Sequence, residues 1–331
     1  MTFEVKDIVG LSKPLERLVE VIASGLGAVS KPYFIKKTAE AKAYEIQVVA
    51  KAMADSQQQL THSVYDDGKI KIISPEFQLD TLSLSDRATL RKRSQEIRQQ
   101  QNVEAICADA AGDLQNESTV PEEKPELGWI SRFMSIAADI SADELQFLWG
   151  KILAGEIKKP GSFSLRTLDV LRNLSAKEAE AFAKLGNYIF SAGDKFFFIE
   201  ARAYISTRNG GLTFQDILEL KDAGLVFESD LEFSFPATSE ASTAHLIYGP
   251  LILLFEREKD TPKIATVAGV LTKVGVELLK LLTIEPEMEY VSFAGQRFDH
   301  AGTKFAWASV TQIVDGKINY DKKTYAEPSV S

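Results

Sequence analysis

Residues 127–172 constrain the fold most, because they combine the densest helical periodicity of the chain with two of its three tryptophans. Apolar residues recur there at three- and four-residue spacing, which places them on one face of a helix. Two more helices follow after short connections, and three short helices joined in this way form an antiparallel packing unit. We therefore expect a buried helical core, with four central residues: Trp129, Phe133, Trp149 and Leu153.

Capping signals set the expected boundaries of these helices. Ser141, followed three residues later by Glu144, fits a capping box, so the second helix is expected to start at Ser141. Its end is expected where Gly155, Lys158 and Lys159 are followed by Pro160. Gly161 should then turn the chain, and either Ser162 or Ser164 should cap a third helix.

The start of that third helix is also a candidate binding site. Free amides at a helix start can hold a phosphate group, and an arginine can close over it with two parallel hydrogen bonds. The alternative, which we favour, is an ordinary helix start with a serine cap. The residues concerned are Gly161, Ser162, Ser164 and Arg166.

The sequences WGKILAGEI (residues 149–157) and PGSFSLRTL (residues 160–168) resemble a block shared by a bacterial family that is defined only as a domain of unknown function. The resemblance covers roughly residues 25–172 and includes KPYFIKKTAEAKAYEIQ and QEIRQQQNVEAI. Relatives of that family look like abortive-infection alpha-type proteins. The resemblance implies a bacterial cytoplasmic protein in antiphage defence, and it implies no catalytic residues.

The charge of the chain bears on nucleic-acid binding. A net charge of −9 disfavours a protein whose main function is non-specific nucleic-acid binding, because neutralising phosphates requires a concentrated positive field. One helix, expected from residue 85 or 86 to residue 111, holds a basic patch that is either a phosphate-contacting face or a solvated face balanced by nearby acids. We favour the solvated face. The patch consists of Arg87, Arg91, Lys92, Arg93 and Arg98.

Two helices are expected in the N-terminal region, at residues 9–29 and 33–60. The first has an apolar stripe but lacks the cationic polar face of an interfacial helix, so membrane contact is the less favoured alternative. The second is rich in strong helix formers and has small seam residues such as Ala39 and Ala43. Together they present more apolar surface than two helices can bury alone, so they either fold back on the central block or pair between chains. We expect pairing between chains, and therefore a homo-oligomer.

The C-terminal half alternates helices and strands. Ser175 with Glu178 predicts a capping box, KFFFI a strand, and Thr213 and Thr272 the starts of two further helices. This order, with LEFSF and HLIYGPLILLFE as strands, is similar to that of a winged-helix domain, although no basic recognition helix is present. Protein contact is therefore the favoured use of the region. The segments MEYVSFAGQRF, TKFAWASVTQIV and KINY are expected to be strands of a small antiparallel sheet.

The expected fold class is α+β and mostly helical. The chain has 331 residues, which is enough for two or three domains. We predict an N-terminal helical region at 1–111, a polar linker at 112–126, a central helical domain at 127–190, a winged-helix-like α+β domain at 191–285, and C-terminal antiparallel strands at 286–331.

Catalytic chemistry has little support in the sequence. His62, His245 and His300 lie far apart without the spacing of a metal site, and the common phosphate-binding and nucleophile motifs do not occur. The single cysteine, Cys107, excludes an intramolecular disulfide and fits a reducing compartment. We expect no metal and no cofactor.

The expected function is that of a non-enzymatic cytoplasmic interaction protein that self-associates and serves as a component or sensor of antiphage defence. Neither a signal peptide nor an apolar run long enough to span a membrane is expected. A metal-dependent nuclease is one alternative, because Glu256 and Glu258 follow an apolar strand. A membrane-perturbing effector that uses residues 9–29 is another.

Overall fold

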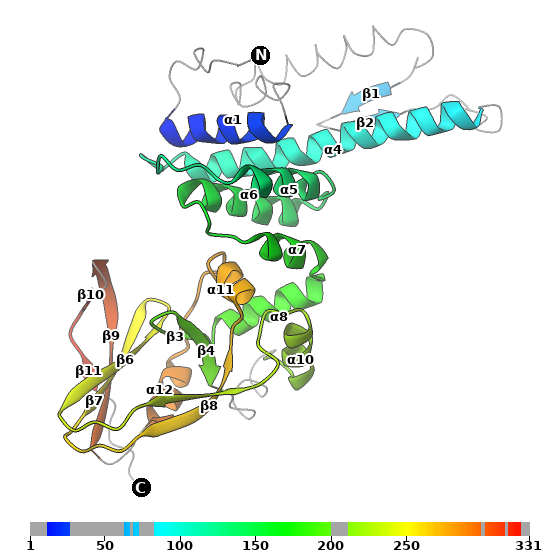
Figure 1. The fold of residues 1–331 in the computed structure, drawn as a ribbon. Coiled ribbons are helices and arrows are strands. Elements are labelled where there is room, and N and C mark those ends of the chain that lie inside the picture. Colours follow the sequence, from blue (N-terminus) through cyan, green and yellow to red (C-terminus); the bar gives the residue numbers. More distant parts are fainter. Residues whose placement is uncertain are drawn as a thin grey trace. The chain divides into compact units, whose positions relative to one another are not determined.

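The computed structural model describes residues 12–26, 63–66, 69–72, 83–199, 211–298, 302–314 and 317–325. The chain divides into two compact units, Met1–Ser162 and Phe163–Ser331 (Figure 1). The described residues form nine helices and a nine-stranded antiparallel sheet, besides one two-stranded sheet, which confirms an α+β fold with substantial helix. The boundary between the units falls inside the predicted 127–190 domain, and the five-segment division stays a prediction.

The first unit is built from four described helices and a small antiparallel ribbon. Helix α4 packs on α6, α5 and α1, and α1 also packs on α5 and α6. Strands β1 and β2 pair with each other. The elements are α1 (Lys13–Leu26), β1 (Ser63–Asp66), β2 (Lys69–Ile72), α4 (Leu84–Leu114), α5 (Leu127–Ala137) and α6 (Asp143–Lys158).

Aromatic stacking holds the centre of this unit together. The ring of Trp129 stacks on that of Phe133 at a centroid distance of 5.0 Å, and Phe133 contacts the ring of Trp149 at 5.3 Å. These three residues and Leu153 are buried, as the helical periodicity predicts. Burial of large aromatic side chains is a major contribution to the stability of a core.

A close approach of two backbones lets α6 pack against α4. A Cβ atom added at Gly150 would lie 2.6 Å from the Cβ of Asp109 and 3.0 Å from the backbone nitrogen of Ala110. Glycine is therefore the residue that lets the two helices approach this closely.

The apolar stripe of α1 is used inside the chain. Leu18, Val19 and Ile22 are buried, and Gly25 lies so close to Met134 of α5 that an added Cβ would be 2.8 Å from its Cγ. These residues of the stripe that suggested membrane contact or pairing between chains are thus buried inside the chain, where α1 packs on α5, α4 and α6. The second helix of that argument, predicted at residues 33–60, lies outside the described residues.

The predicted start of α6 is wrong. Ala142 is the N-cap residue and makes no side-chain capping bond, so Ser141 and Glu144 do not form a capping box. Instead, the buried side chain of Gln146 donates hydrogen bonds to the carbonyl oxygen of Ile140 and to Oδ1 of Asn102. This side chain satisfies the carbonyl oxygen of the turn before α6, and the free amides at the start of α6 receive no side-chain cap.

Four helices of the second unit begin with a side-chain cap, as predicted. Ser164, Ser175, Thr213 and Thr272 each accept the amide hydrogen of the residue three positions later. The capping box of Ser175 and Glu178 is confirmed, and Thr213 forms another with Asp216. The four capped helices are α7 (Leu165–Asn173), α8 (Ala176–Gly186), α10 (Phe214–Asp222) and α11 (Lys273–Leu279), and the fifth described helix of this unit, α12 (Met288–Arg297), has no side-chain cap.

One antiparallel sheet organises the second unit (Figure 1). The described strands lie in the order β10-β9-β7-β6-β3-β4-β8-β5, and β11 pairs with β9. Strands from the predicted winged-helix-like and C-terminal segments therefore share a sheet, and the winged-helix-like description is not confirmed. The strands are β3 (Phe190–Ala192), β4 (Lys195–Ile199), β5 (Leu231–Phe235), β6 (Ser242–Tyr248), β7 (Leu251–Arg257), β8 (Ile264–Val270), β9 (Thr303–Val314), β10 (Lys317–Tyr320) and β11 (Thr324–Tyr325).

The segment MEYVSFAGQRF, expected to be a strand, forms helix α12. Its buried residues Tyr290, Val291 and Ala294 recur with helical spacing, which outweighs the β propensity of its aromatic and β-branched residues. Gly295 permits contact with the sheet, because an added Cβ would lie 2.4 Å from the ring of Phe305 on β9. The Tyr290 hydroxyl accepts the amide hydrogen of Ile199 at 3.0 Å, which fixes the helix against β4.

Candidate functional site

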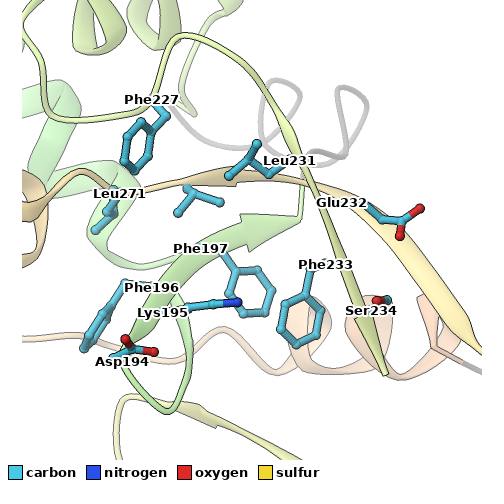
Figure 2. A pocket seen from close by; sticks show the side chains of 11 residues that line it. Asp194, Lys195, Phe196, Phe197, Phe227, Leu231, Glu232, Phe233, Ser234 and Leu271 are labelled. Atoms are coloured by element: carbon cyan, nitrogen blue, oxygen red, sulfur yellow. The ribbon is translucent and has the colours of Figure 1, made fainter. Parts of the chain in front are cut away.

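A pocket of about 400 Å³ opens at the β5 end of the sheet, where β4, β8 and the loop before β5 meet. Figure 2 shows Phe227 and Leu231 on one side of the pocket and the rings of Phe196, Phe197 and Phe233 on the other. Asp194, Lys195 and Glu232 also line it. The pocket is mainly apolar, with a few charged groups, which is the usual composition of a binding site.

Two stacked rings form the rigid part of the pocket. Strand β8 lies between β4 and β5, and its register places Phe197 opposite Val270 and Phe233 opposite Thr266 on the same face. Because the β8 residues between the two rings are small, the rings meet across the strand with centroids 4.1 Å apart and planes inclined by 21°. Phe298 of α12 contacts Phe233 edge-on at 5.9 Å. The stack is therefore supported by the core.

The opposite wall of the pocket is exposed. Phe227 and Leu231 are each 48% exposed although both are large and apolar. The amide of Phe227 donates a hydrogen bond of 2.9 Å to the carbonyl oxygen of Val270, so the loop is fixed to β8. Exposed apolar side chains that gather around a concave surface mark an interaction site.

Strand β5 also offers backbone groups. In the part of the sheet that the structure describes, β5 pairs with β8 on one side and is an end strand. The outer N–H and C=O groups of an end strand can pair with another chain. Glu232 bears the only charge within β5, and it forms an ion pair with Lys263. The pocket and the strand edge thus form one continuous surface.

The start of α7 already holds a carboxylate from the chain itself. Glu277 Oε2 accepts hydrogen bonds from the Ser164 amide at 2.6 Å and from the Thr167 hydroxyl at 2.5 Å. The Gly161 amide donates to Glu156 Oε1 at 2.6 Å, and the Ser162 amide donates to the Lys159 carbonyl oxygen at 3.1 Å. These donors are used internally, which is the arrangement of an ordinary helix start, and Arg166 is exposed.

The chain matches the family model described as Protein of unknown function (DUF2806) over residues 86–293. It belongs to this DUF2806 family. No curated protein and no solved structure matches the chain. The matched range includes every residue that lines the pocket and the whole start of α7.

The basic patch lies within the DUF2806 range, on α4. All five of its residues are exposed, and Lys92 forms an exposed ion pair with Glu96 at 3.8 Å. The patch is therefore accessible to a ligand. An ion pair of this kind contributes little to stability.

Of the two acidic residues considered for a nuclease, Glu258 is exposed and Glu256 has structural partners. Glu256 forms an ion pair with Lys323, and the Tyr325 hydroxyl donates to its carboxylate at 3.2 Å. The hydrogen bond from Lys323 is the main reason why the pKa of Glu256 lies below its ordinary value. Among the described residues, no group of three or more histidine, cysteine, aspartate or glutamate side chains could hold a metal ion.

The other candidate residues are dispersed. His245 is exposed on β6, and His62 and His300 lie outside the described residues. Cys107 is buried in α4, and its burial strongly raises the pKa of its thiol. Of the helices that the structure describes, none has the length and apolar character needed to cross a bilayer.

Sequence reasoning missed the pocket. The aromatic residues of KFFFI and LEFSF indicated two strands, but nothing in either segment indicated that both flank β8. Clusters of aromatic residues in two strands with small residues in a third are the signal that would suggest such a stack. Pairing between distant strands has to be known before that signal can be used.

Proposed function

We propose that this DUF2806 protein acts by binding other protein chains through β5 and the adjacent pocket. The observation that carries the proposal is the exposure of Phe227 and Leu231 beside the Phe197–Phe233 stack. An open strand edge next to an apolar pocket can combine backbone hydrogen bonds with side-chain recognition. Burial of the two exposed side chains would supply much of the binding energy.

The partner that we propose first is a second copy of the chain. Two β5 strands paired antiparallel about Phe233 would place Leu231 of one copy opposite Phe235 of the other, and Glu232 opposite Ser234. Apolar residues would then meet apolar residues on one face, and like charges would not oppose each other. Such a two-fold contact is closed, because each copy uses the same surface.

The biological setting belongs to the same proposal. The resemblance to abortive-infection alpha-type proteins supports a role as a component or sensor of antiphage defence in the bacterial cytoplasm. The proposed protein contact does not require a winged-helix geometry, because strands β5 to β8 belong to the large sheet.

Sedimentation equilibrium of the full chain at micromolar concentration tests the proposal. We expect a dimer of the 36.6 kDa chain, and we expect Leu231→Lys to make it monomeric by placing a charge at the apolar contact. Ile313→Lys is the matched control, since Ile313 is 59% exposed on β9, away from β5. It should leave the dimer intact.

A monomeric wild-type chain would contradict self-association, and a Leu231→Lys dimer would contradict its placement at β5. If the dimer is lost instead when residues 1–60 are removed, the contact lies in the N-terminal region, where the sequence first placed it. If the Ile313→Lys control also became monomeric, a specific role for β5 in the dimer would be excluded.

A further inference from the structure

The N-terminal half of α4 carries a row of arginines on an exposed surface. Every residue from 87 to 98 is exposed, whereas Val103, Ile106 and Ala110 in the second half are buried. Figure 1 shows this half of α4 extending beyond α5 and α6. Among the described helices, the packing of the first unit uses the second half of α4, and the first half is an exposed arm.

The spacing of the arginines places them in line. Arg87, Arg91 and Arg98 are separated by four and seven residues, so they lie on one face of the helix. Ser94 lies between Arg91 and Arg98 on the same face, and Gln101 follows the row one turn beyond Arg98. At the rise of an α-helix, the row spans roughly 16 Å. Arg93 belongs to the same arm but points to a different side.

The charge of the arm is opposite to that of the whole chain. Residues 84–98 contain five cationic and two acidic residues, while the chain carries a net charge of −9. Among the described residues, no ion pair involves Arg87, Arg91 or Arg98, so their guanidinium groups face solvent. Guanidinium groups bind phosphate oxygens with two parallel hydrogen bonds.

We propose that the row formed by Arg87, Arg91 and Arg98 binds the phosphate backbone of double-stranded DNA. Successive phosphates of one strand rise about 3.4 Å along the axis of B-DNA while the strand turns around it, so a straight row of roughly 16 Å meets a few phosphates where it crosses a strand. Ser94 and Gln101 supply the kind of polar side chain that also donates to phosphates. Such contacts do not depend on base sequence. The acidic remainder of the chain restricts the DNA to the arm.

This binding is independent of the proposed function, because β5 and α4 belong to different units. The test is fluorescence anisotropy with a labelled DNA duplex of mixed sequence, titrated with the full chain from about 50 mM salt upward. The triple variant Arg87→Gln, Arg91→Gln and Arg98→Gln should bind at least tenfold more weakly. Three phosphate contacts predict a slope of log K against log salt of about −2.7.

Arg91→Gln and Arg93→Gln form a matched pair on the same arm. Arg91→Gln should weaken binding and reduce the magnitude of the slope by about 1, whereas Arg93→Gln should leave the slope unchanged. Helical circular dichroism of each variant checks that α4 is intact. Sedimentation of the triple variant separates this test from the proposed function, since loss of DNA binding should leave any dimer unchanged.

Absence of binding at about 50 mM salt would overturn the proposal. Equal effects of Arg91→Gln and Arg93→Gln on DNA binding would also overturn it, because the overall positive charge of the arm, and not the row of arginines, would then be responsible for the binding. Tighter binding to single-stranded RNA or to polyglutamate, with the same dependence on the arginines, would assign the row to another partner.

Discussion

Thr167 and Glu277 are joined by a hydrogen bond of 2.5 Å from the threonine hydroxyl to a carboxylate that is buried between α7 and α11. The same oxygen accepts the Ser164 amide, so a residue of α11 completes the start of α7. A negative charge at a helix N-terminus is favoured by the helix dipole. Two helices far apart in the sequence thereby share one polar contact.

Replacing Thr167 by valine should lower the free energy of unfolding by about 1–3 kcal/mol, because the buried carboxylate loses a donor. Urea denaturation measures the change. Thr89→Val is the matched control, since the Thr89 hydroxyl donates to the carbonyl oxygen of Ser85 on an exposed surface. The control should change stability by no more than about 0.5 kcal/mol. Equal effects of the two substitutions would contradict a special role for the buried contact.

Trp149→Ala should lower the free energy of unfolding by about 3–5 kcal/mol, as large-to-small substitutions in a core do. Trp149 is fully buried against Phe133. Phe147→Ala on the same helix removes a side chain that is 54% exposed and should cost about 1 kcal/mol or less. An unchanged denaturation midpoint for Trp149→Ala would mean that this side chain lies at the surface.

Two glycine-to-alanine substitutions should change stability in opposite directions. Gly112→Ala in α4 should stabilise the protein by about 0.5–1 kcal/mol, because no atom lies within 4 Å of the added Cβ and alanine favours a helix. Gly150→Ala should destabilise it, because the added Cβ would lie 2.6 Å from the Asp109 Cβ. Thermal unfolding of the two variants checks this. If both raise the melting temperature, α4 and α6 do not pack closely at Gly150.

Two capping carboxylates should make stability depend on pH. The hydrogen bond from the Ser175 hydroxyl is the main reason why the pKa of Glu178 is lowered, and the hydrogen bond from the Ser175 amide adds to it. The hydroxyl and the amide of Thr213 lower the pKa of Asp216 in the same way. A carboxyl with a lowered folded-state pKa stabilises the fold above its unfolded pKa, about 4.3 for glutamate and 3.9 for aspartate. That contribution is lost as the pH falls through the folded value.

The double variant Glu178→Gln and Asp216→Asn should therefore be less stable than the wild type at pH 7, and the difference should shrink below about pH 4. Denaturation midpoints measured across this range give the comparison. Glu180→Gln serves as the control, because Glu180 pairs with Lys184 on the exposed side of α8 and does not cap a helix. A difference that stays constant with pH would exclude the two caps as its source.

Local signals predicted more than distant ones. The caps at Ser164, Ser175, Thr213 and Thr272 were predictable because each signal lies within four residues. The predicted cap at Ser141 is wrong because α6 begins one residue later, with Ala142 as its N-cap residue. A capping pattern alone does not fix the helix start to the exact residue.

The sheet and its pocket depend on contacts that no single segment contains. Strand β8 pairs with β4 and with β5, although these strands are separated from it in the sequence. Helix α12 was predicted as a strand, although Tyr290, Val291 and Ala294 recur with helical spacing. That spacing was present in the sequence, so this error was avoidable, whereas the strand order was not.

The stacked pair Trp129 and Phe133, with Trp149 beside it, gives the first unit a distinct optical signature. Two of the three tryptophans lie in that unit, and the third, Trp307, is only partly buried on β9. The sheet unit instead holds a dense network of phenylalanine and tyrosine rings around Phe190, Tyr248 and Tyr290. Blue-shifted tryptophan emission therefore reports chiefly on the helical unit. The near-ultraviolet circular dichroism of phenylalanine and tyrosine reports on the sheet, so one sample can reveal whether the two units melt together.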